Sequence, residues 1–192
     1  ILDEAYSGRS TKDKLAAVRE KMKEKGAEVH LLASLYDIAW LLNVRGNDIS
    51  YVPVVLSYLA LTQEQCIWFL QEEVVDDTLR EYLQKNGITT RPYEAFYEYV
   101  KTLENQTILL NRAVVNTKIC NNLPESAQMI DAEDPTLEMK AVKNETEISN
   151  TRKAHVKDAV AMCRFMYWLK KNVGKIPMTE ISASDYLESL RR

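Results

Sequence analysis

The first part of the chain alternates between helical and strand-like patterns. After Ser10, a residue typical of a helix N-cap, apolar residues recur at helical spacing, and residues 29–33 form an apolar run of strand length. Residues 34–42 have the spacing of a second helix, and we place Asp37 on its polar side. A helix followed by a strand and a second helix is therefore predicted for this opening segment.

The alternation continues with two runs rich in β-branched and aromatic residues, separated by four polar residues as in a hairpin. The pattern predicts strands at residues 54–61, 66–70, 88–92 and 107–110. It predicts helices between and after them, at residues 76–86, 93–103 and 113–121. Strands interleaved with helices are typical of an α/β domain with a mixed or largely parallel sheet.

The pattern changes in the last third of the chain. Asn144 is a good helix N-cap with Glu147 as its capping-box partner, and a long helix with apolar residues on two sides follows. A second helix, opened by Thr179, runs to the end of the sequence. We interpret residues 1–135 as the α/β domain and residues 136–192 as the first helices of a second domain whose remainder is missing.

Composition and charge exclude several classes of function. The 192 residues contain 25 Lys and Arg against 28 Asp and Glu, so the net charge of −3 gives no electrostatic case for nucleic acid or an anionic membrane. The longest uncharged stretch, residues 49–63, contains Pro53 and is too short to span a bilayer. No secretory signal opens the sequence and the three cysteines are irregularly spaced, which favours the cytoplasm.

Few side chains here have the spacing that catalysis or metal binding needs. His155 and Asp158 offer two ligands, fewer than a zinc or manganese site requires, and His30 borders an apolar run as a core or edge histidine. Cysteines 66, 120 and 163 fall in a predicted strand, near a helix C-terminus and in mid-helix, where thiolates are not stabilised. We predict no catalytic residue and no metal site in this chain.

The candidate functional segment is the irregular loop 43–53, where Arg45 and Asp48 flank a glycine turn at Gly46. A guanidinium group can tie down a carboxylate or several carbonyl oxygens, so we favour a role for the two residues as a loop clamp. In the alternative interpretation, Arg45 or Asp48 points at a ligand or a partner domain.

Two separated blocks resemble the three-domain Xaa-Pro aminopeptidases, the aminopeptidase P family. The first block resembles that family's middle domain and consists of Trp40-Leu41-Leu42-Asn43-Val44-Arg45-Gly46-Asn47-Asp48, Pro53-Val54 and Ser57-Tyr58. The second resembles the entry into its catalytic domain and consists of Lys140-Ala141-Val142-Lys143-Asn144, Arg152-Lys153-Ala154-His155, Lys157-Asp158-Ala159-Val160 and Thr179-Glu180-Ile181-Ser182-Ala183. Tyr51-Val52 departs from the pattern, because the family often has Asn directly before this proline.

The resemblance implies a fold for this chain and assigns the catalytic metals to another part of the enzyme. The middle domain is similar to the creatinase/prolidase N-terminal module, a ribonuclease H-like domain with a mixed six-stranded sheet, and the last two helices resemble the opening of a truncated pita-bread domain. The family's catalytic domain holds two divalent metals, usually manganese, on two Asp, one His and two Glu, and no residue here matches them. The resemblance therefore implies an inactive fragment, a scaffold that also lines substrate access, of a cytoplasmic enzyme that removes the residue preceding proline from peptides.

Two alternatives stay open at the level of the sequence. The same module occurs in prolidase- and creatinase-like enzymes, and the chain is alternatively a freestanding interaction module without enzymatic activity. The long helix with two apolar sides needs a covering surface, so we expect a homodimer or a swapped arrangement.

Overall fold

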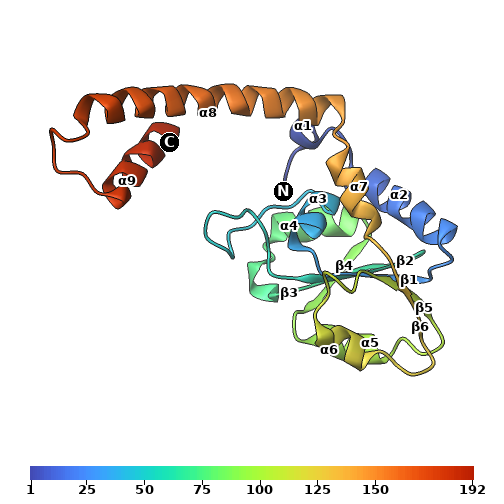
Figure 1. The fold of residues 1–192 in the computed structure, drawn as a ribbon. Coiled ribbons are helices and arrows are strands. Elements are labelled where there is room, and N and C mark those ends of the chain that lie inside the picture. The colour runs from blue at the N-terminus through green and yellow to red at the C-terminus, as the bar shows by residue number, and fades with distance from the viewer. The chain divides into compact units, whose positions relative to one another are not determined.

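The computed structural model describes all 192 residues, which form two compact units, residues 1–143 and residues 144–192 (Figure 1). The boundary falls after Lys143, later than the position at residue 135 that the sequence pattern suggested. The reason is helix α7 (Pro135–Ala141), which packs on helices α2 (Thr11–Glu24) and α3 (Leu35–Leu41) and so belongs to the first unit.

The first unit contains a mixed sheet of six strands in the order β4-β3-β2-β1-β5-β6. Strand β2 runs antiparallel to both of its neighbours, whereas all other adjacent strands are parallel. The predicted α/β fold with a mixed six-stranded sheet is therefore confirmed. The strands are β1 (Val29–Leu32), β2 (Tyr58–Thr62), β3 (Cys66–Leu70), β4 (Ile88–Pro92), β5 (Thr107–Leu110) and β6 (Gln128–Asp131).

Helices cover both faces of the sheet (Figure 1). Side chains of α2, α3 and α4 (Asp77–Lys85) build one core cluster, and side chains of α5 (Ala95–Lys101) and α6 (Thr117–Asn122) build the other. Two short elements, α1 (Glu4–Ser7) and the 3-10 helix η1 (Glu72–Val74), lie outside these layers. The unit is thus a three-layer arrangement of helix, sheet and helix.

Strand β3 shows why the central strands are continuous apolar runs instead of alternating patterns. Cys66, Trp68 and Leu70 belong to the core cluster on one face, and Ile67 and Phe69 belong to the cluster on the other. A strand that is buried on both faces needs apolar side chains at every position. Strand β1 is also buried along its whole length, and there His30 is the one polar residue among apolar neighbours.

A buried lysine joins helix α2 to the end of helix α3. The Nζ of Lys14 donates hydrogen bonds to the carbonyl oxygen of Trp40 at 2.8 Å and to Oδ1 of Asn43 at 2.7 Å, and it lies 4.3 Å from the centre of the Trp40 ring. Asn43 has a positive φ of 50° and donates through Nδ2 to the carbonyl oxygen of Arg9 at 2.9 Å. These contacts fix the point at which α3 ends and the irregular loop begins.

One expectation for helix α3 is wrong. Asp37 does not lie on a solvated side, because it is only 3% exposed and its Oδ1 lies 2.5 Å from Nζ of Lys140 on α7. The reason is that α7 packs against α3 and brings Lys140 to Asp37. Neither α7 nor the edge strand β6 was predicted from the sequence.

The second unit consists of two helices, α8 (Glu145–Asn172) and α9 (Glu180–Arg191). Capping boxes open both of them, Asn144 with Glu147 in α8 and Thr179 with Ser182 in α9, so the predicted N-caps are confirmed. The helices pair through the stacked rings of Trp168 and Tyr186, whose centres are 4.2 Å apart. The exposed side chains of Asp158 and Arg191 also form an ion pair of 2.7 Å between them.

Much of the apolar surface of helix α8 is exposed. Val156, Val160 and Tyr167 are 66%, 54% and 65% exposed, and Ala161 is the one buried residue of the helix. Despite its length, α8 is too polar to cross a membrane, and no other helix of the structure meets that requirement either.

Replacing Lys14 by methionine tests the junction between α2 and α3. Lys14→Met keeps most of the volume but leaves two carbonyl oxygens without their ammonium donor, so we expect the free energy of unfolding to fall by about 2 kcal/mol or more. Urea denaturation of the chain measures this loss. The matched variant Lys12→Met, at an exposed position on the same helix, is expected to change stability by less than about 0.5 kcal/mol. Equal effects of the two variants would contradict the proposed role of Lys14.

Candidate functional site

The candidate site is formed by the loop that joins α3 to β2, residues 43–57. Arg45 holds the beginning of this loop, because its Nη1 donates to the carbonyl oxygens of Ala39 at 3.0 Å and Val44 at 2.8 Å. Partial burial of the guanidinium group lowers the pKa of Arg45, yet an arginine keeps its positive charge at neutral pH. Arg45 therefore ties the loop to the last turn of α3 and also leaves a cation beside it.

Asp48 holds the far end of the loop. Its Oδ2 accepts a hydrogen bond of 2.7 Å from the backbone N–H of Leu56, and its own N–H donates to the carbonyl oxygen of Val54 at 3.4 Å. No ion pair joins Asp48 to Arg45, since each of the two side chains contacts backbone groups. Both residues therefore stabilise the same loop, but each binds a different stretch of backbone and they do not bind each other.

Gly46, between these two residues, is required by close packing and not by its backbone angle. A Cβ atom added to it would lie 2.5 Å from Cγ2 of Val55 and 2.8 Å from the carbonyl oxygen of Val54. Contacts under 3.0 Å to backbone are not tolerated without displacement. The two limbs of the loop can therefore approach each other only with glycine at this position.

A cavity of about 300 Å³ lies between this loop, strand β3 and the start of helix α4. Its walls include residues 44–48 and Trp68, together with Asp76 and Thr78 at the beginning of α4. The buried Nε1 of Trp68 has no hydrogen-bond partner in the chain. An unpaired buried indole N–H is costly, and the low accessibility of this atom places it beneath the surface of the cavity wall. The volume is at the lower end of that of small-ligand sites.

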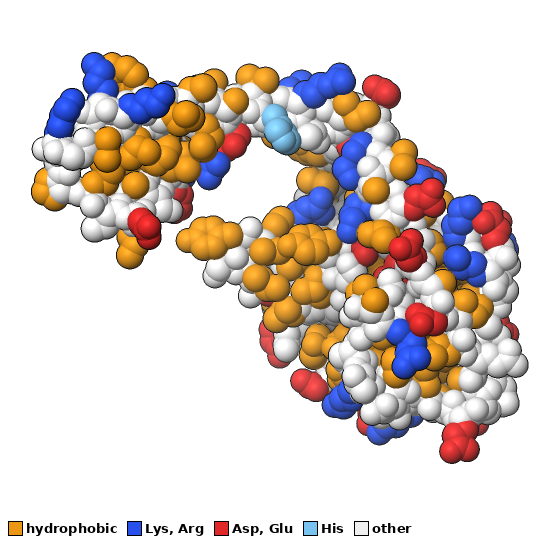
Figure 2. Space-filling model, in the orientation of Figure 1, with side chains coloured by type: hydrophobic (Ala, Val, Ile, Leu, Met, Phe, Trp, Pro, Cys, Tyr) orange, Lys and Arg blue, Asp and Glu red, His pale blue; other side chains and the backbone are white.

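Apolar side chains surround the outer part of the loop. Tyr51 at its tip is 95% exposed and has a φ of +66°, while Ile49 and Leu56 are also exposed. Orange hydrophobic side chains gather on this part of the first unit in Figure 2. Positive φ is an unfavourable conformation for a bulky residue such as tyrosine and is often kept for a functional reason. Sequence reasoning missed Tyr51, although the departure of Tyr51-Val52 from the family pattern was a signal.

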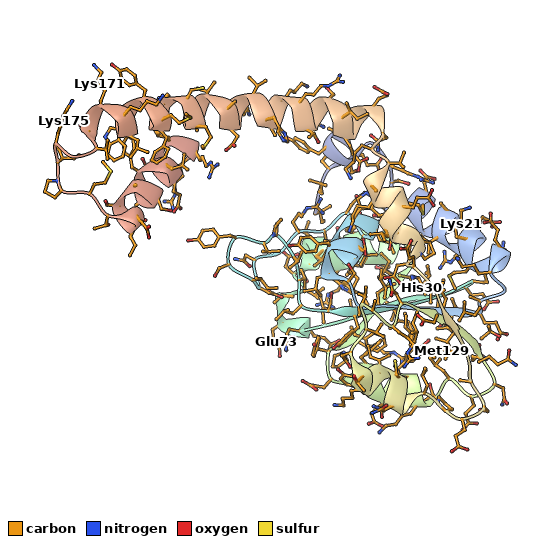
Figure 3. The ribbon with its side chains drawn as sticks, in the orientation of Figure 1. Lys21, His30, Glu73, Met129, Lys171 and Lys175 are labelled. Carbon is orange, nitrogen blue, oxygen red and sulfur yellow. The ribbon has the colours of Figure 1, made fainter.

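The histidines and cysteines do not assemble an active centre. No group of three or more His, Cys, Asp or Glu side chains converges as a metal site would require. His30 lies inside the first unit (Figure 3), whereas Nδ1 of the exposed His155 lies 2.9 Å from the carbonyl oxygen of Thr151. Burial raises the pKa of the Cys66 thiol to about 12, which disfavours the reactive thiolate. These 192 residues thus offer a shaped loop and a cavity, and no group of three His, Cys, Asp or Glu side chains that could hold a metal ion.

Comparison with known sequences decides the family. The sequence model of the creatinase/prolidase N-terminal domain matches residues 1–147. The chain belongs to that family. The match covers the whole first unit, including the loop 43–57 and the cavity beside it.

This member of the creatinase/prolidase N-terminal domain family is similar to Xaa-Pro aminopeptidases over its whole length. It is 33% identical to Xaa-Pro aminopeptidase 1 of Dictyostelium discoideum over 196 residues, which cover 100% of this chain and 31% of that protein. The crystal structure of X-prolyl aminopeptidase from Caenorhabditis elegans, described as a cytosolic enzyme with a di-nuclear active site, matches with a TM-score of 0.89 and 28% identity, covering 99% of this chain and 32% of that one. The chain spans about a third of the length of the curated relatives it matches.

The fold is shared more widely than the sequence. The Xaa-Pro dipeptidase from Bacillus anthracis has a TM-score of 0.66 with 16% identity, over 95% of this chain and 49% of that one. At this identity the likeness shows the fold alone.

Replacing Gly46 by alanine tests the packing of the loop. Gly46→Ala adds a methyl group that meets the backbone of Val54, so we expect a loss of about 1–3 kcal/mol in the free energy of unfolding. The variant Asn47→Ala, at the exposed neighbouring position, serves as control and is expected to stay within about 0.5 kcal/mol of the unmodified chain. Denaturant midpoints measure both. A Gly46→Ala variant as stable as the control would show that the two limbs of the loop are not closely packed.

Proposed function

We propose that this chain is a non-catalytic part of an Xaa-Pro aminopeptidase, an enzyme that removes the N-terminal residue from peptides with proline in second position. The observation that carries the proposal is the similarity to X-prolyl aminopeptidases in sequence and fold along the whole chain, which spans only about a third of those proteins. The absence of any three-ligand cluster in these residues supports a role outside the chemistry.

The metals of the proposed enzyme lie outside this chain. A dinuclear centre needs several carboxylate and imidazole ligands around two ions, and the residues here do not fit one. We propose that the rest of the protein supplies the ligands, that the ions are divalent, with manganese as the expected metal, and that the enzyme acts in the cytoplasm. No catalytic step is assigned to a residue of this chain.

The loop 43–57 is the part of the chain that we propose for substrate access. Arg45 and Asp48 hold the loop at its two ends, and the cavity beside it is lined by residues 44–48 of the loop. Tyr51 contributes an exposed ring at the tip. A rigid loop with an apolar tip suits contact with a peptide or with the neighbouring catalytic domain, and Arg45 and Asp48 serve this role by positioning the loop.

The second unit is proposed to be the beginning of the catalytic domain. Ala161 is the one buried residue of its two helices, and exposed residues such as Val156, Val160 and Tyr167 need a cover. We propose that the remainder of the catalytic domain provides this cover and that the full enzyme is a homodimer.

A prolidase-like dipeptidase is the second candidate, because the matching family model describes prolidase as well as creatinase N-terminal domains. The higher sequence identity to aminopeptidases than to the structurally similar dipeptidase favours the aminopeptidase.

Peptide cleavage distinguishes these proposals. We expect the full protein that contains this chain to cleave an Xaa-Pro-Xaa tripeptide in the presence of manganese, and we expect the 192 residues alone to cleave nothing because they lack the ligands for a metal pair. Peptide turnover followed by chromatography measures both. Cleavage by the 192 residues alone would contradict the assignment of the metals to the remainder of the protein. Exclusive cleavage of Xaa-Pro dipeptides by the full protein would favour the prolidase-like alternative.

Substitution of Tyr51 tests the role of the loop tip. In the full protein we expect Tyr51→Gly to reduce kcat/KM for an Xaa-Pro tripeptide several-fold, whereas its stability stays unchanged or rises because glycine adopts positive φ without strain. Tyr51→Phe is the matched control and is expected to keep both activity and stability, since it retains the ring. Unchanged turnover in Tyr51→Gly would exclude a contribution of the loop tip to substrate access.

A further inference from the structure

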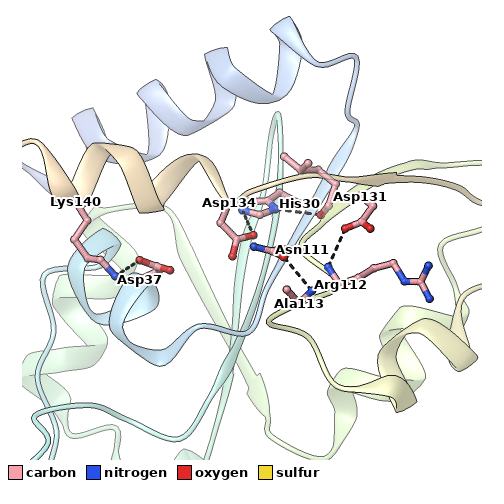
Figure 4. Close-up of polar contacts among 9 residues, drawn as sticks. His30, Asp37, Asn111, Arg112, Ala113, Asp131, Asp134 and Lys140 are labelled. Atoms are coloured by element: carbon pink, nitrogen blue, oxygen red, sulfur yellow. Dashed lines mark hydrogen bonds and ion pairs between the residues drawn. The ribbon is translucent and has the colours of Figure 1, made fainter.

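A cluster of buried polar side chains lies beneath helix α7, away from the loop 43–57. Figure 4 shows His30 from β1, Asp37 from α3, Asp134 at the N-cap of α7 and Lys140 from α7. The buried Thr136, in the first turn of α7, also belongs to the cluster. His30 and Thr136 are fully buried, and Asp37 and Asp134 are nearly so. Three atoms of the cluster have no hydrogen-bond partner in the chain, namely Nε2 of His30, Oδ1 of Asp134 and Oγ1 of Thr136, whereas Oδ1 of Asp37 faces the ammonium group of Lys140.

The hydrogen bond of His30 to the neighbouring strand fixes its tautomer. Nδ1 of His30 lies 3.1 Å from the carbonyl oxygen of Leu109 on β5. A carbonyl oxygen only accepts, so Nδ1 carries the hydrogen. In a neutral ring Nε2 is then a bare acceptor, and it is the atom that faces Oδ1 of Asp134 at 3.8 Å.

Asp134 has no cation of its own to compensate a negative charge. Lys140 lies 2.5 Å from Oδ1 of Asp37 and forms its ion pair there. Asp134 is the N-cap residue of α7, yet its side chain makes no capping hydrogen bond. If Asp134 were ionised, two carboxylates would share the single positive charge of Lys140. Its oxygen would also face Nε2 of His30, and both atoms are then hydrogen-bond acceptors that repel each other.

The other elements around the pair bring no further compensating charge. Leu61 of β2, opposite His30 in the sheet, is apolar. Asp131 at the end of β6 accepts a hydrogen bond from the backbone N–H of Arg112 at 3.0 Å. The exposed Lys21 of α2 forms its ion pair with Glu24 of the same helix at 2.8 Å. The charges that face the pair are therefore those of Asp37 from α3 and Lys140 from α7.

We propose that Asp134 carries a proton in the folded protein and shares it with Nε2 of His30, so that a neutral buried carboxyl–imidazole pair holds α7 on the sheet. A rotation of the Asp134 side chain shortens the separation of 3.8 Å to a hydrogen bond. The proton then gives a partner to two of the three unpaired atoms at once. Loss of this proton weakens the docking of α7, so the pair acts as a latch that depends on pH.

The electrostatics of the two groups agree with a neutral pair. Burial, reinforced by the nearby charge of Asp37 and opposed by Lys140, raises the pKa of Asp134 to about 7. Burial lowers the pKa of His30 to about 4, against the opposing influence of its hydrogen bond to Leu109 and of Asp37. Both shifts have the same cause, since a dry environment disfavours the carboxylate and the imidazolium alike.

The pair makes two opposite contributions to the pH dependence of stability. Asp134 binds its proton more tightly in the folded chain, so its contribution is present below about pH 4 and is lost as the pH rises through about 7. His30 binds its proton more tightly in the unfolded chain, so its contribution grows as the pH rises from about 4 to 6.5. The two nearly cancel between about pH 4 and 6.5, and the loss from Asp134 remains above that range.

Nuclear magnetic resonance of the chain tests where the proton lies. We expect the side-chain carboxyl carbon of Asp134 to have the chemical shift of a protonated acid at pH 5 and to titrate near pH 7. We expect the ring nitrogens of His30 to report a neutral Nδ1–H tautomer at pH 5. An ionised Asp134 at pH 5, whether beside a protonated His30 or bridged by a water, would overturn the proposal.

Two variants separate the contributions of the pair. Asp134→Asn mimics the protonated acid and leaves only the histidine effect, so its unfolding constant, relative to that of the unmodified chain, is expected to fall by up to tenfold per pH unit between pH 4 and 6.5. His30→Gln leaves only the Asp134 effect, and the relative slope has the opposite sign. Glu133→Gln, at the exposed neighbouring position, is the control and should show no relative slope. Equal pH profiles for Asp134→Asn and Glu133→Gln would overturn the latch, and the resonance experiment on the unmodified chain decides the question if a variant does not fold.

Discussion

A buried ammonium group determines how the first unit is put together around its candidate site. Nζ of Lys14 contacts the last turn of α3 and the amide of Asn43, and so it fixes where a helix becomes a loop. The sheet cannot provide this information, because its strands only require apolar cover. The positions of Arg45 and Gly46 follow from the point at which the loop begins, since both lie within three residues of Asn43, and both line the adjacent cavity.

Elements with strong local signals were predictable from the sequence. Strands 88–92 and 107–110 have the bounds that their apolar and β-branched residues indicated, and α8 begins at the capping box of Asn144. Strand β6 and helix α7 were missed because β6 is a mostly exposed edge strand and α7 is a helix of only seven residues that begins with a proline. The error at Asp37 follows from the second omission, since helical spacing identifies a polar face and does not tell which element covers it.

The candidate site was predictable in part, and the limit is physical. Turn-forming residues around Gly46 identify the loop, and the chemistry of Arg45 and Asp48 identifies anchoring groups. The positive φ of Tyr51 and the unpaired indole of Trp68 depend on tertiary packing, which leaves no local trace in the sequence. The proximity of His30 to Asp134 also depends on tertiary structure. The two residues are far apart in the sequence and come close because β5 and β6 follow β1 in the sheet.

The outer strands of the sheet also bear on how the molecule behaves at high concentration. Strand β4 ends in Arg91 and Pro92, and β6 is short and ends in Asp131. Charged side chains, proline and short length are the means by which proteins prevent their sheet margins from joining those of other molecules. Growth of ordered aggregates by strand addition is therefore disfavoured in the α/β unit. Association between copies should instead begin at the exposed apolar side chains of α8, and a mild detergent would suppress it.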